Sequence, residues 1–305
     1  MAENFNNINP EDLVSRYASN YNLDRKTISI EMVLKHWTLE KALTRLLRDS
    51  TPANRKTVFY EAYNTLYKEL PWLAKSGSNV NDAVSTQIFT ERWLSLLNDV
   101  QGKLIYEIGS GNGGLITFLA DSGAICTGTE LAVGRPDKKP YPNLEWHNTD
   151  GVNLVDYEPK AHYDLVISDQ VVEHFHPDDI SLHFKNVNQL LKPGGKYVFY
   201  TPHYYIGPGD VSLVFGTLEA EGMHLKEYKY AEIYKLLKAS GFKKIAMPVN
   251  LKNGVKMLPL FWVQVFLLLE KSLLIVKSVR LRKRIYHRLI RPFKISHEIV
   301  VIAQK

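Results

Sequence analysis

Hydrophobic and polar positions in the first hundred residues follow the period of an α-helix. One predicted helix carries apolar residues at i, i+3, i+4, i+7 and i+8, all on a single face: Leu39, Ala42, Leu43, Leu46 and Leu47. Pro52 stands where a second helix would begin, directly after residues that can cap it, and Pro71 stands near its end. A third helix is expected around Trp93. The pattern therefore predicts a helical region over residues 1–100.

From about residue 101 the pattern changes to short apolar runs separated by segments of helix length. Six strand candidates precede residue 250 and one more closes the chain: 103–108, 124–129, 144–148, 163–168, 196–201, 242–249 and 299–303. Short apolar runs that alternate with helices are typical of βαβ units. This part of the chain is therefore predicted to form a parallel sheet covered by helices.

A long segment, 251–294, separates the last two strand candidates. Its residues 258–269 are apolar apart from Pro259 and Gln264, a run too short to span a bilayer. Nine basic residues and no acidic ones lie between Lys271 and Lys294. The segment could lie on a membrane surface as an amphipathic helix, cover a substrate cleft, or present a solvated face.

Composition and charge narrow the class of protein. The 305 residues are 45% apolar and 23% charged, which excludes disordered, collagen-like and coiled-coil chains. The net charge of +6 comes from the second half of the 251–294 segment, because without the nine basic residues from Lys271 to Lys294 the balance becomes −3. The single cysteine, Cys126, excludes an internal disulfide and is expected to pack as a small apolar residue. The polar N-terminus does not resemble a secretory signal, so we expect a cytoplasmic protein.

A glycine-rich turn follows the first strand candidate. Its sequence from Glu107 is Glu-Ile-Gly-Ser-Gly-Asn-Gly-Gly, and glycines let a ligand approach the backbone closely. Gly109, Gly111 and Gly114 also satisfy the dinucleotide fingerprint. Glu107 argues against a dinucleotide, because its carboxylate would repel a pyrophosphate and suits a cationic ligand.

Carboxylates follow the next three strand candidates. Glu130 ends the second strand, where it can accept hydrogen bonds from ribose hydroxyls, Asp150 follows the third, and Asp169 follows the fourth. Open α/β sheets bind their ligands at these carboxyl ends of the strands. The simpler alternatives are a turn residue for Asp150 and a surface strand end for Glu130.

These motifs, in this order and spacing, resemble class I S-adenosylmethionine-dependent methyltransferases. The resemblance covers about residues 100–250 and rests on 107–113, Glu130, Asp150, 163–174 and 190–195. Residues 200–203, 224–228 and 241–242 further resemble a branch that methylates small molecules, sugars and lipids.

The resemblance implies a fold class and two regions. The expected α/β fold is doubly wound and Rossmann-like, with a mostly parallel seven-stranded sheet and S-adenosylmethionine as cofactor. Residues 1–100 would form a helical lid that binds substrate. Residues 101–305 would form the methyltransferase domain, with 251–294 as a helical insert before the last strand.

The resemblance also implies cofactor-binding residues. They are Glu107, Gly109, Gly111, Gly113, Glu130, Asp150, Gly151, Asp169 and Gln170. The glycines would pass under the methionine and ribose portions, and Glu107 would hold the amino end. Glu130 would bind the ribose diol, Asp150 would face the adenine amino group, and Asp169 and Gln170 would line the methionine side.

Three histidines are candidates for a general base. Methyl transfer to a hydroxyl is helped by removal of the hydroxyl proton, and histidine is the usual base near neutral pH. The candidates are His174, His203 and His224, although His174 could serve a structural hydrogen bond and His224 could fix a loop. Glu173, Tyr204 and Tyr205 are expected to contact the acceptor. Tyr60, Tyr63 and Tyr67 share a helical face and are expected to pack in the core.

No metal ion is expected. Asp169, Glu173 and His174 could supply only a partial ligand set, and the histidine and carboxylate spacing matches no zinc signature.

The favoured hypothesis is methyl transfer to a small-molecule acceptor, at a hydroxyl of a secondary metabolite, sugar or lipid. Nitrogen and carbon acceptors stay open. A nucleic-acid (RNA) methyltransferase is disfavoured, because the sequence shows no zinc knuckle or RNP motif. Enzymes that methylate exocyclic amines carry an Asn/Asp-Pro-Pro-Tyr/Phe tetrapeptide after the fourth strand, and this sequence has Asp169-Gln-Val-Val there. A membrane-associated lipid or quinone methyltransferase, in peripheral contact through 258–294, is the other alternative.

Overall fold

The computed structural model describes residues 9–76, 83–132, 141–251, 254–293 and 295–305. The N-terminal part is helical, as predicted. Its helices are α1 (Pro10–Asn20), the short η1 (Arg25–Thr27), α2 (Ile30–Arg48), α3 (Arg55–Glu69), α4 (Pro71–Ser76) and α5 (Ala83–Leu97). Ser29 caps α2 by accepting a hydrogen bond from the Met32 N–H.

The buried face of α2 differs from the predicted one. Leu43 and Leu47 are buried as expected, but Leu46 is 58% exposed. The helix instead buries His36 and Glu40, because Glu40 accepts a hydrogen bond from the Met223 N–H at 3.1 Å. A polar contact with a distant loop therefore decided the orientation of this helix.

A seven-stranded sheet forms the centre of the molecule, in the order β3-β2-β1-β4-β5-β9-β6. Its strands are β1 (Leu104–Ile108), β2 (Ile125–Thr129), β3 (Leu144–His147), β4 (Tyr163–Asp169), β5 (Leu191–Pro202), β6 (Lys244–Ala246) and β9 (Glu298–Gln304). The first five in this order are parallel, and β9 runs antiparallel to β5 and β6. The predicted mostly parallel, doubly wound sheet is confirmed.

The strand expected over 242–249 is two strands. β6 ends at Ala246, and β7 (Pro248–Leu251) pairs with β8 (Gly254–Met257) in a separate hairpin. Pro248 has no N–H with which to extend the ladder of the main sheet. The predicted helical insert therefore opens with a β-hairpin.

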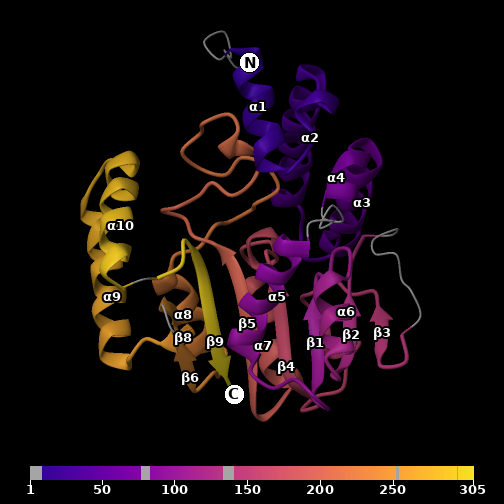
Figure 1. Ribbon diagram of the computed structural model, residues 1–305, viewed down its shortest axis with the longest axis vertical. Coiled ribbons are helices and arrows are strands. Elements are labelled where there is room, and N and C mark those ends of the chain that lie inside the picture. The colour runs from indigo at the N-terminus through magenta and orange to yellow at the C-terminus, as the bar shows by residue number, and fades with distance from the viewer. Residues whose placement is uncertain (1–8, 77–82, 133–140, 252–253, 294) are drawn as a thin grey trace.

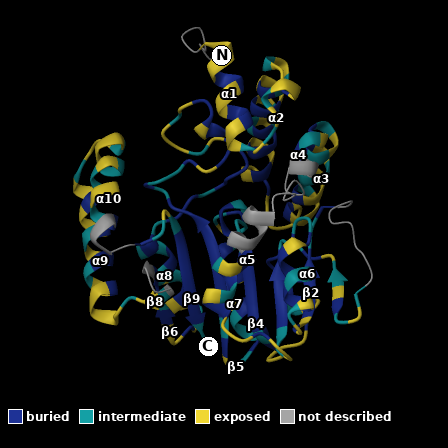
Figure 2. Cartoon of the chain, in the orientation of Figure 1, coloured by how far each residue is buried: buried dark blue, intermediate teal, exposed yellow. Residues whose placement is uncertain are grey.

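Helices cover both faces of the sheet. They are α6 (Gly114–Asp121), α7 (Ile180–Leu190), α8 (Tyr230–Ala239), α9 (Leu260–Ser272) and α10 (Val279–Phe293), and the short turns η2 (Leu154–Asp156), η3 (Val172–His174), η4 (Val211–Leu213) and η5 (Leu273–Ile275) lie in the connections. Tyr106 and Phe199 belong to one core cluster, which includes residues of α7 to α10, whereas Ile105 and Val198 belong to another, which includes residues of α5 and α6. Side chains thus alternate between the two faces, and the strands between them are buried (Figure 2).

Helices α1 to α4 stand over the carboxyl ends of the parallel strands, α5 lies on one face of the sheet, and α9 and α10 lie along one edge of the molecule (Figure 1). The Thr44 hydroxyl donates to the Gly222 carbonyl at 2.5 Å, which joins α2 to the loop after β5. None of the described helices has the length and apolar character needed to cross a membrane.

Candidate active site

A cavity lies at the carboxyl ends of β1, β2 and β4, where open α/β sheets bind ligands. Residues from these strand ends, from the loop after β3 and from α3 line it: Phe59, Tyr63, Tyr67, Ile108, Gly109, Gly111, Thr129, Glu130, Leu131, Thr149, Asp150, Gly151, Asp169, Gln170, Val171, His174 and Phe175. Seven of the nine expected cofactor-binding residues therefore border one space. Glu107 and Gly113 are not among the lining residues.

The glycine turn after β1 needs glycine for two reasons. Gly109 has a φ of 69°, in the left-handed region that side chains disfavour. A Cβ at Gly109 would also lie 2.7 Å from Cγ2 of Val171. The bare backbone therefore forms this part of the cavity wall and leaves a ligand room to approach. Gly113 is the N-cap of α6.

Glu107 is buried without a full set of partners. Its side chain is 3% exposed, and its Oε2 atom has no hydrogen-bond partner among the described residues. Burial raises the pKa of Glu107 to about 8, and the nearby carboxylates of Asp169 and Glu130 add to the effect. A buried carboxyl with an unused acceptor fits a cationic group, such as an amino group, close to the glycine turn.

Glu130 and Asp150 are held in place by backbone donors. Glu130 accepts the N–H groups of Leu131 at 2.8 Å, Ala132 at 3.1 Å and Gly111 at 3.0 Å. Asp150 accepts the N–H groups of Val152 and Asn153 at 2.9 and 2.8 Å, so it also serves the following turn. Both side chains are thus oriented before any ligand arrives.

Asp169 and Gln170 are supported by residues that the sequence did not single out. The Asp169 carboxylate lies 3.7 Å from the Arg92 guanidinium and accepts from Trp93 Nε1 at 3.3 Å. Burial raises the pKa of Asp169 to about 6, although the Arg92 charge opposes the shift. Gln170 Nε2 donates to Glu298 Oε1 at 2.6 Å. Helix α5 and strand β9 therefore position the end of β4.

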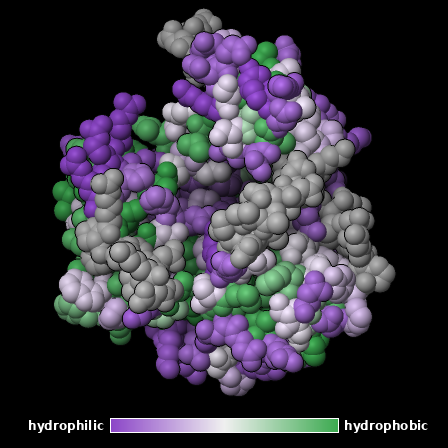
Figure 3. All heavy atoms as spheres, in the orientation of Figure 1, coloured by the Kyte–Doolittle hydropathy of each residue, from purple (hydrophilic) through white to green (hydrophobic). Residues whose placement is uncertain are grey.

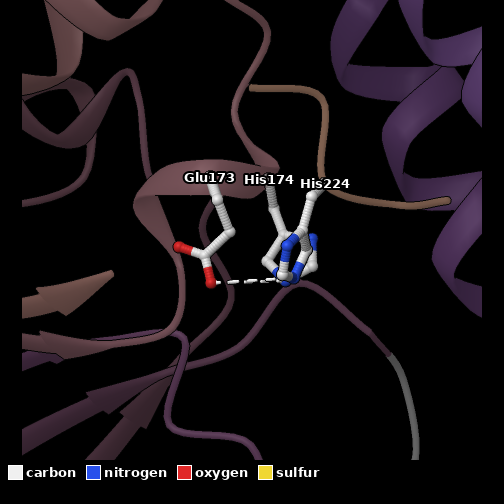
Figure 4. Close-up of side chains that lie close together, drawn as sticks. All are labelled: Glu173, His174 and His224. Carbon is white, nitrogen blue, oxygen red and sulfur yellow. Dashed lines mark ion pairs between the residues drawn. The ribbon is translucent and has the colours of Figure 1, made fainter. Parts of the chain in front are cut away.

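Glu173, His174 and His224 converge on one point (Figure 4). Glu173 Oε1 lies 4.0 Å from His174 Nε2 and 3.9 Å from His224 Nε2. The Thr201 hydroxyl donates to Glu173 Oε2 at 2.8 Å, whereas Oε1 has no hydrogen-bond partner among the described residues. The sequence proposed all three residues separately, and the fold brings them together.

The three groups differ in their affinity for protons. Burial, followed by the charge of His224, lowers the pKa of His174 to about 3. Burial raises the pKa of Glu173 to about 7. Burial alone would lower the pKa of His224, but its hydrogen bond to Glu227 and the charges of Glu173 and Asp210 raise it to about 9. At neutral pH His174 is therefore neutral and His224 is cationic.

Hydrogen bonding also defines the tautomer of His174. Its Nδ1 lies 3.0 Å from the Met223 carbonyl oxygen, which can only accept, so Nδ1 carries the hydrogen and Nε2 keeps a lone pair. His174 lines the cavity and keeps 27% of its side chain exposed. This ring can accept a proton from a group bound in the cavity.

The same cluster is the set of side chains that could hold a metal ion. The ligand atoms of Glu173, His174 and His224 all lie within 4.8 Å of one another. Two imidazoles and a carboxylate are suitable ligands for a divalent transition metal. Binding there would first displace the proton of His224, since only a neutral imidazole coordinates a metal.

The structure corrects the expected positions of His203 and Tyr205. His203 is 1% exposed, its Nε2 lies 2.7 Å from Glu270 Oε1, and its ring stacks on Tyr286 with centroids 4.3 Å apart. Tyr205 is fully buried beside it. Neither residue lines the cavity, because α9 and α10 cover the segment after β5.

Tyr204 is likewise absent from the cavity lining. Its hydroxyl donates to Glu219 Oε1 at 2.6 Å.

Aromatic side chains of α3 take the place expected for Tyr204 and Tyr205. Tyr63 and Tyr67 border the cavity, and the Tyr63 ring meets His174 edge-on with centroids 6.1 Å apart. Tyr60, on the same predicted face, is 40% exposed. The expectation that this face packs in the core was wrong, although its i, i+4 aromatic spacing was visible in the sequence.

Comparison with known proteins defines the family. A family model described as a methyltransferase domain matches residues 87–247, more than half of the chain. The chain therefore belongs to the methyltransferase-domain family. The predicted class I S-adenosylmethionine-dependent methyltransferase, an enzyme with S-adenosylmethionine as cofactor, is confirmed. No curated protein matches the chain.

Solved structures share the fold at low sequence identity. The 1,6-didemethyltoxoflavin-N1-methyltransferase of Burkholderia thailandensis, bound to 1,6-didemethyltoxoflavin and S-adenosylhomocysteine, is 16% identical with a TM-score of 0.51, over 84% of this chain and 91% of its own. An S-adenosylmethionine-dependent methyltransferase from Mesorhizobium loti is 19% identical with a TM-score of 0.46, over 69% and 94%. The magnesium protoporphyrin IX methyltransferase of Synechocystis, with bound S-adenosylhomocysteine, is 20% identical with a TM-score of 0.48, over 63% and 91%.

Proposed function

We propose that this enzyme methylates a hydroxyl group of a small-molecule acceptor. The observation that carries the proposal is the Nε2 lone pair of His174 at the wall of the cavity, backed by Glu173 and His224. A hydroxyl is a weak nucleophile until its proton is removed, so a site for hydroxyl acceptors benefits from a positioned base.

The residues around the glycine turn fit the cofactor. The unused Glu107 oxygen suits its amino group, and the bare Gly109 backbone leaves room beside the turn. Glu130 would bind the ribose hydroxyls and Asp150 the adenine amino group, since both line the cavity with fixed carboxylates. When bound, S-adenosylmethionine supplies an electrophilic methyl group, and the protein chiefly provides orientation.

The cluster would move the acceptor proton in two stages. His174 Nε2 faces the acceptor and receives the hydroxyl proton first. Its low pKa makes it a poor place for the proton to stay. Glu173, whose pKa is about 7 and whose Oε1 lacks a partner, would hold the proton afterwards. The charge of His224 favours the ionised form of Glu173, which is the form that can take up the proton.

The acceptor would be flat and largely apolar. Phe59, Tyr63 and Tyr67 present aromatic rings to the cavity from α3. We infer that residues 1–100 act as a substrate-binding lid over the methyltransferase domain, and that nucleic acid is not the substrate.

Paired acceptors test the choice of atom. Purified enzyme is incubated with S-adenosylmethionine and a set of acceptors of the same shape that differ only in the acceptor atom: phenols, anilines and thiophenols. The release of S-adenosylhomocysteine is measured for each acceptor. We expect phenols to turn over at least about tenfold faster than their anilines, because only the hydroxyl needs the base. Preference for the amine would overturn the hydroxyl assignment and support a nitrogen acceptor.

We propose that the reaction needs no metal ion, because the cationic His224 ring occupies the place of a third ligand. Turnover is measured after exhaustive chelation, with the untreated enzyme as control. We expect both rates to agree within about twofold. Complete loss that a divalent transition metal restores would refute this proposal and assign the cluster to metal binding.

A further inference from the structure

The outer face of α9 and η5 exposes large apolar side chains. Phe261 is 69% exposed, Leu268 66% and Ile275 84%. Three more exposed residues lie in the same stretch: Leu260, Trp262 and Leu274. Single exposed apolar residues are ordinary on a soluble protein, but a contiguous group marks an interaction surface.

This outer face is not needed to hold the helix in place. The opposite face of α9 is anchored in the core by Val263, Phe266 and Leu267, each at most 5% exposed. Glu270 on the same inner side is 1% exposed and bonds to His203. The helix is therefore apolar on both sides, and the described residues of the chain cover only one of them.

A strongly basic helix lies beside this apolar face. Helix α10 buries Tyr286 and Ile290 and exposes Arg280, Arg284 and Arg288 at successive turns. No acidic residue occurs between positions 271 and 294. Over this edge of the molecule, hydrophilic side chains gather at the upper end of the helical pair, with hydrophobic ones beside them (Figure 3).

We propose that the outer face of α9, η5 and α10 docks on the surface of an anionic lipid membrane. Exposed Phe, Trp, Leu and Ile side chains would enter the boundary between headgroups and acyl chains, and the arginines would meet anionic headgroups. An uninterrupted positive charge is complementary to such a surface, and each basic residue near it contributes favourably. A second copy of the same basic face would repel the first, which disfavours self-association through this surface.

Vesicle flotation tests the proposal with the full-length protein. Wild-type protein is mixed with phosphatidylcholine vesicles that contain or lack phosphatidylglycerol, at low and high salt. We expect flotation with the anionic vesicles at low salt, and at least about a tenfold weaker association at high salt or without phosphatidylglycerol. Absence of flotation at low salt would overturn the proposal.

Matched variants assign the surface. The double variant Phe261→Ser with Ile275→Ser is compared with Leu46→Ser with Leu213→Ser, which removes exposed apolar side chains outside the insert, 58% and 50% exposed. We expect the first pair to lose at least about tenfold in vesicle affinity and the second pair to bind like wild type. Equal loss in both pairs, or in neither, would contradict the proposal.

A second pair of double variants tests the contribution of the arginine charges. Arg280→Gln with Arg284→Gln is compared with Arg16→Gln with Arg45→Gln, exposed arginines of α1 and α2. The first pair should weaken anionic-vesicle binding about tenfold and flatten its salt dependence. Identical salt dependence in the two pairs would overturn the proposed role of α10.

Two further measurements separate this surface from the alternatives. Cofactor affinity in solution should be unchanged in every variant, because none of the substituted residues lines the cavity, so failure of the methyltransferase proposal stays distinguishable. Sedimentation of wild type and of the Phe261→Ser, Ile275→Ser variant should give the same mass. If wild type sediments as a dimer, the variant as a monomer, and wild type does not float with vesicles, the partner of this surface would be a second copy of the chain and not a membrane.

Discussion

The strand-end cavity and the helical insert both depart from the usual placement of side chains. The cavity has buried carboxyl groups beside it, whereas the insert exposes large apolar groups to solvent. Around the cavity, Glu107 and Glu173 are buried at 3% and 0% exposure, whereas on the insert Phe261 and Ile275 are exposed at 69% and 84%. Burying a carboxyl group and exposing a large apolar group both cost free energy. Buried polar groups around a cavity indicate a small ligand, and exposed apolar groups on an outer face indicate an extended surface partner.

The pair of His203 and Glu270 in the core shows that burial of polar groups is not enough to indicate function. His203 and Glu270 join β5 to α9 and are fully buried. Glu270 also accepts the N–H groups of Tyr230 and Ala231, and His203 Nδ1 accepts the N–H group of Tyr205, so both side chains of the pair have their hydrogen bonds satisfied. Glu107 and Glu173 each keep an oxygen without a partner among the described residues. Among the buried carboxylates of the described residues, those that keep an unsatisfied oxygen stand beside the cavity.

The largest expected effect is a loss of cofactor affinity when a side chain is added in the glycine turn but not when it is added in an ordinary surface turn. Gly109→Val should lower cofactor affinity at least about a thousandfold, about 4 kcal/mol, because its Cβ would collide with Val171 and force the turn open. Gly102→Val is the control, since Gly102 has a similar φ of 71° but no atom within 4 Å of its Cβ. Calorimetry measures both. Unaltered binding in Gly109→Val and in Glu130→Ala would contradict the assignment of this loop.

The next effect concerns the base. His174→Ala should lower kcat about 10²- to 10⁴-fold with little change in cofactor affinity, because the proton acceptor is lost. With a phenolic acceptor the deficit should shrink as the pH approaches the pKa of the phenol, which then ionises unaided. The exposed His162→Ala is the control and should keep wild-type kcat. A deficit that is constant with pH would show that His174 acts structurally.

A smaller effect sharpens the contrast between His174 and His203. His203→Ala removes the side-chain donor of the buried Glu270 carboxylate, which keeps its two backbone donors, and should lower the free energy of unfolding by about 2–4 kcal/mol. The kcat of the folded fraction should stay within about threefold of wild type. Urea unfolding and active-site titration measure the two quantities, and a large loss of kcat at full stability would restore His203 as a catalytic candidate.

The smallest effect is a pH dependence. The folded pKa of His224 is about 9, above its unfolded value of about 6.5. The folded protein therefore holds a proton that the unfolded chain has released, and its free energy of unfolding falls as the pH rises from about 6.5 to 9. We expect His224→Gln to lose about 1–3 kcal/mol of this dependence. Parallel pH curves for wild type and variant in urea unfolding would contradict the ionised state of His224.

Much of the cavity wall formed by the strand ends was predictable because it is encoded locally. Gly109 follows a strand and turns the chain at once, and Glu130 and Asp150 stand at the ends of neighbouring strands. A parallel sheet brings the carboxyl ends of its strands to one edge, so order along the chain becomes proximity in space. The positions of these residues follow from the period of the apolar runs and from the places where the runs stop.

The rest of the cavity wall, and the cluster of Glu173, His174 and His224 beside it, depended on contacts between segments far apart in the chain. The sequence by itself determined the class I methyltransferase fold, the glycine turn and the concentration of positive charge in one insert. Only the tertiary structure decided that Tyr63 reaches the cavity, that His224 meets Glu173, and that α9 covers His203. The physical reason is that strand ends are brought together by regular backbone hydrogen bonding, whereas helices and loops dock through irregular side-chain packing that no periodic pattern records.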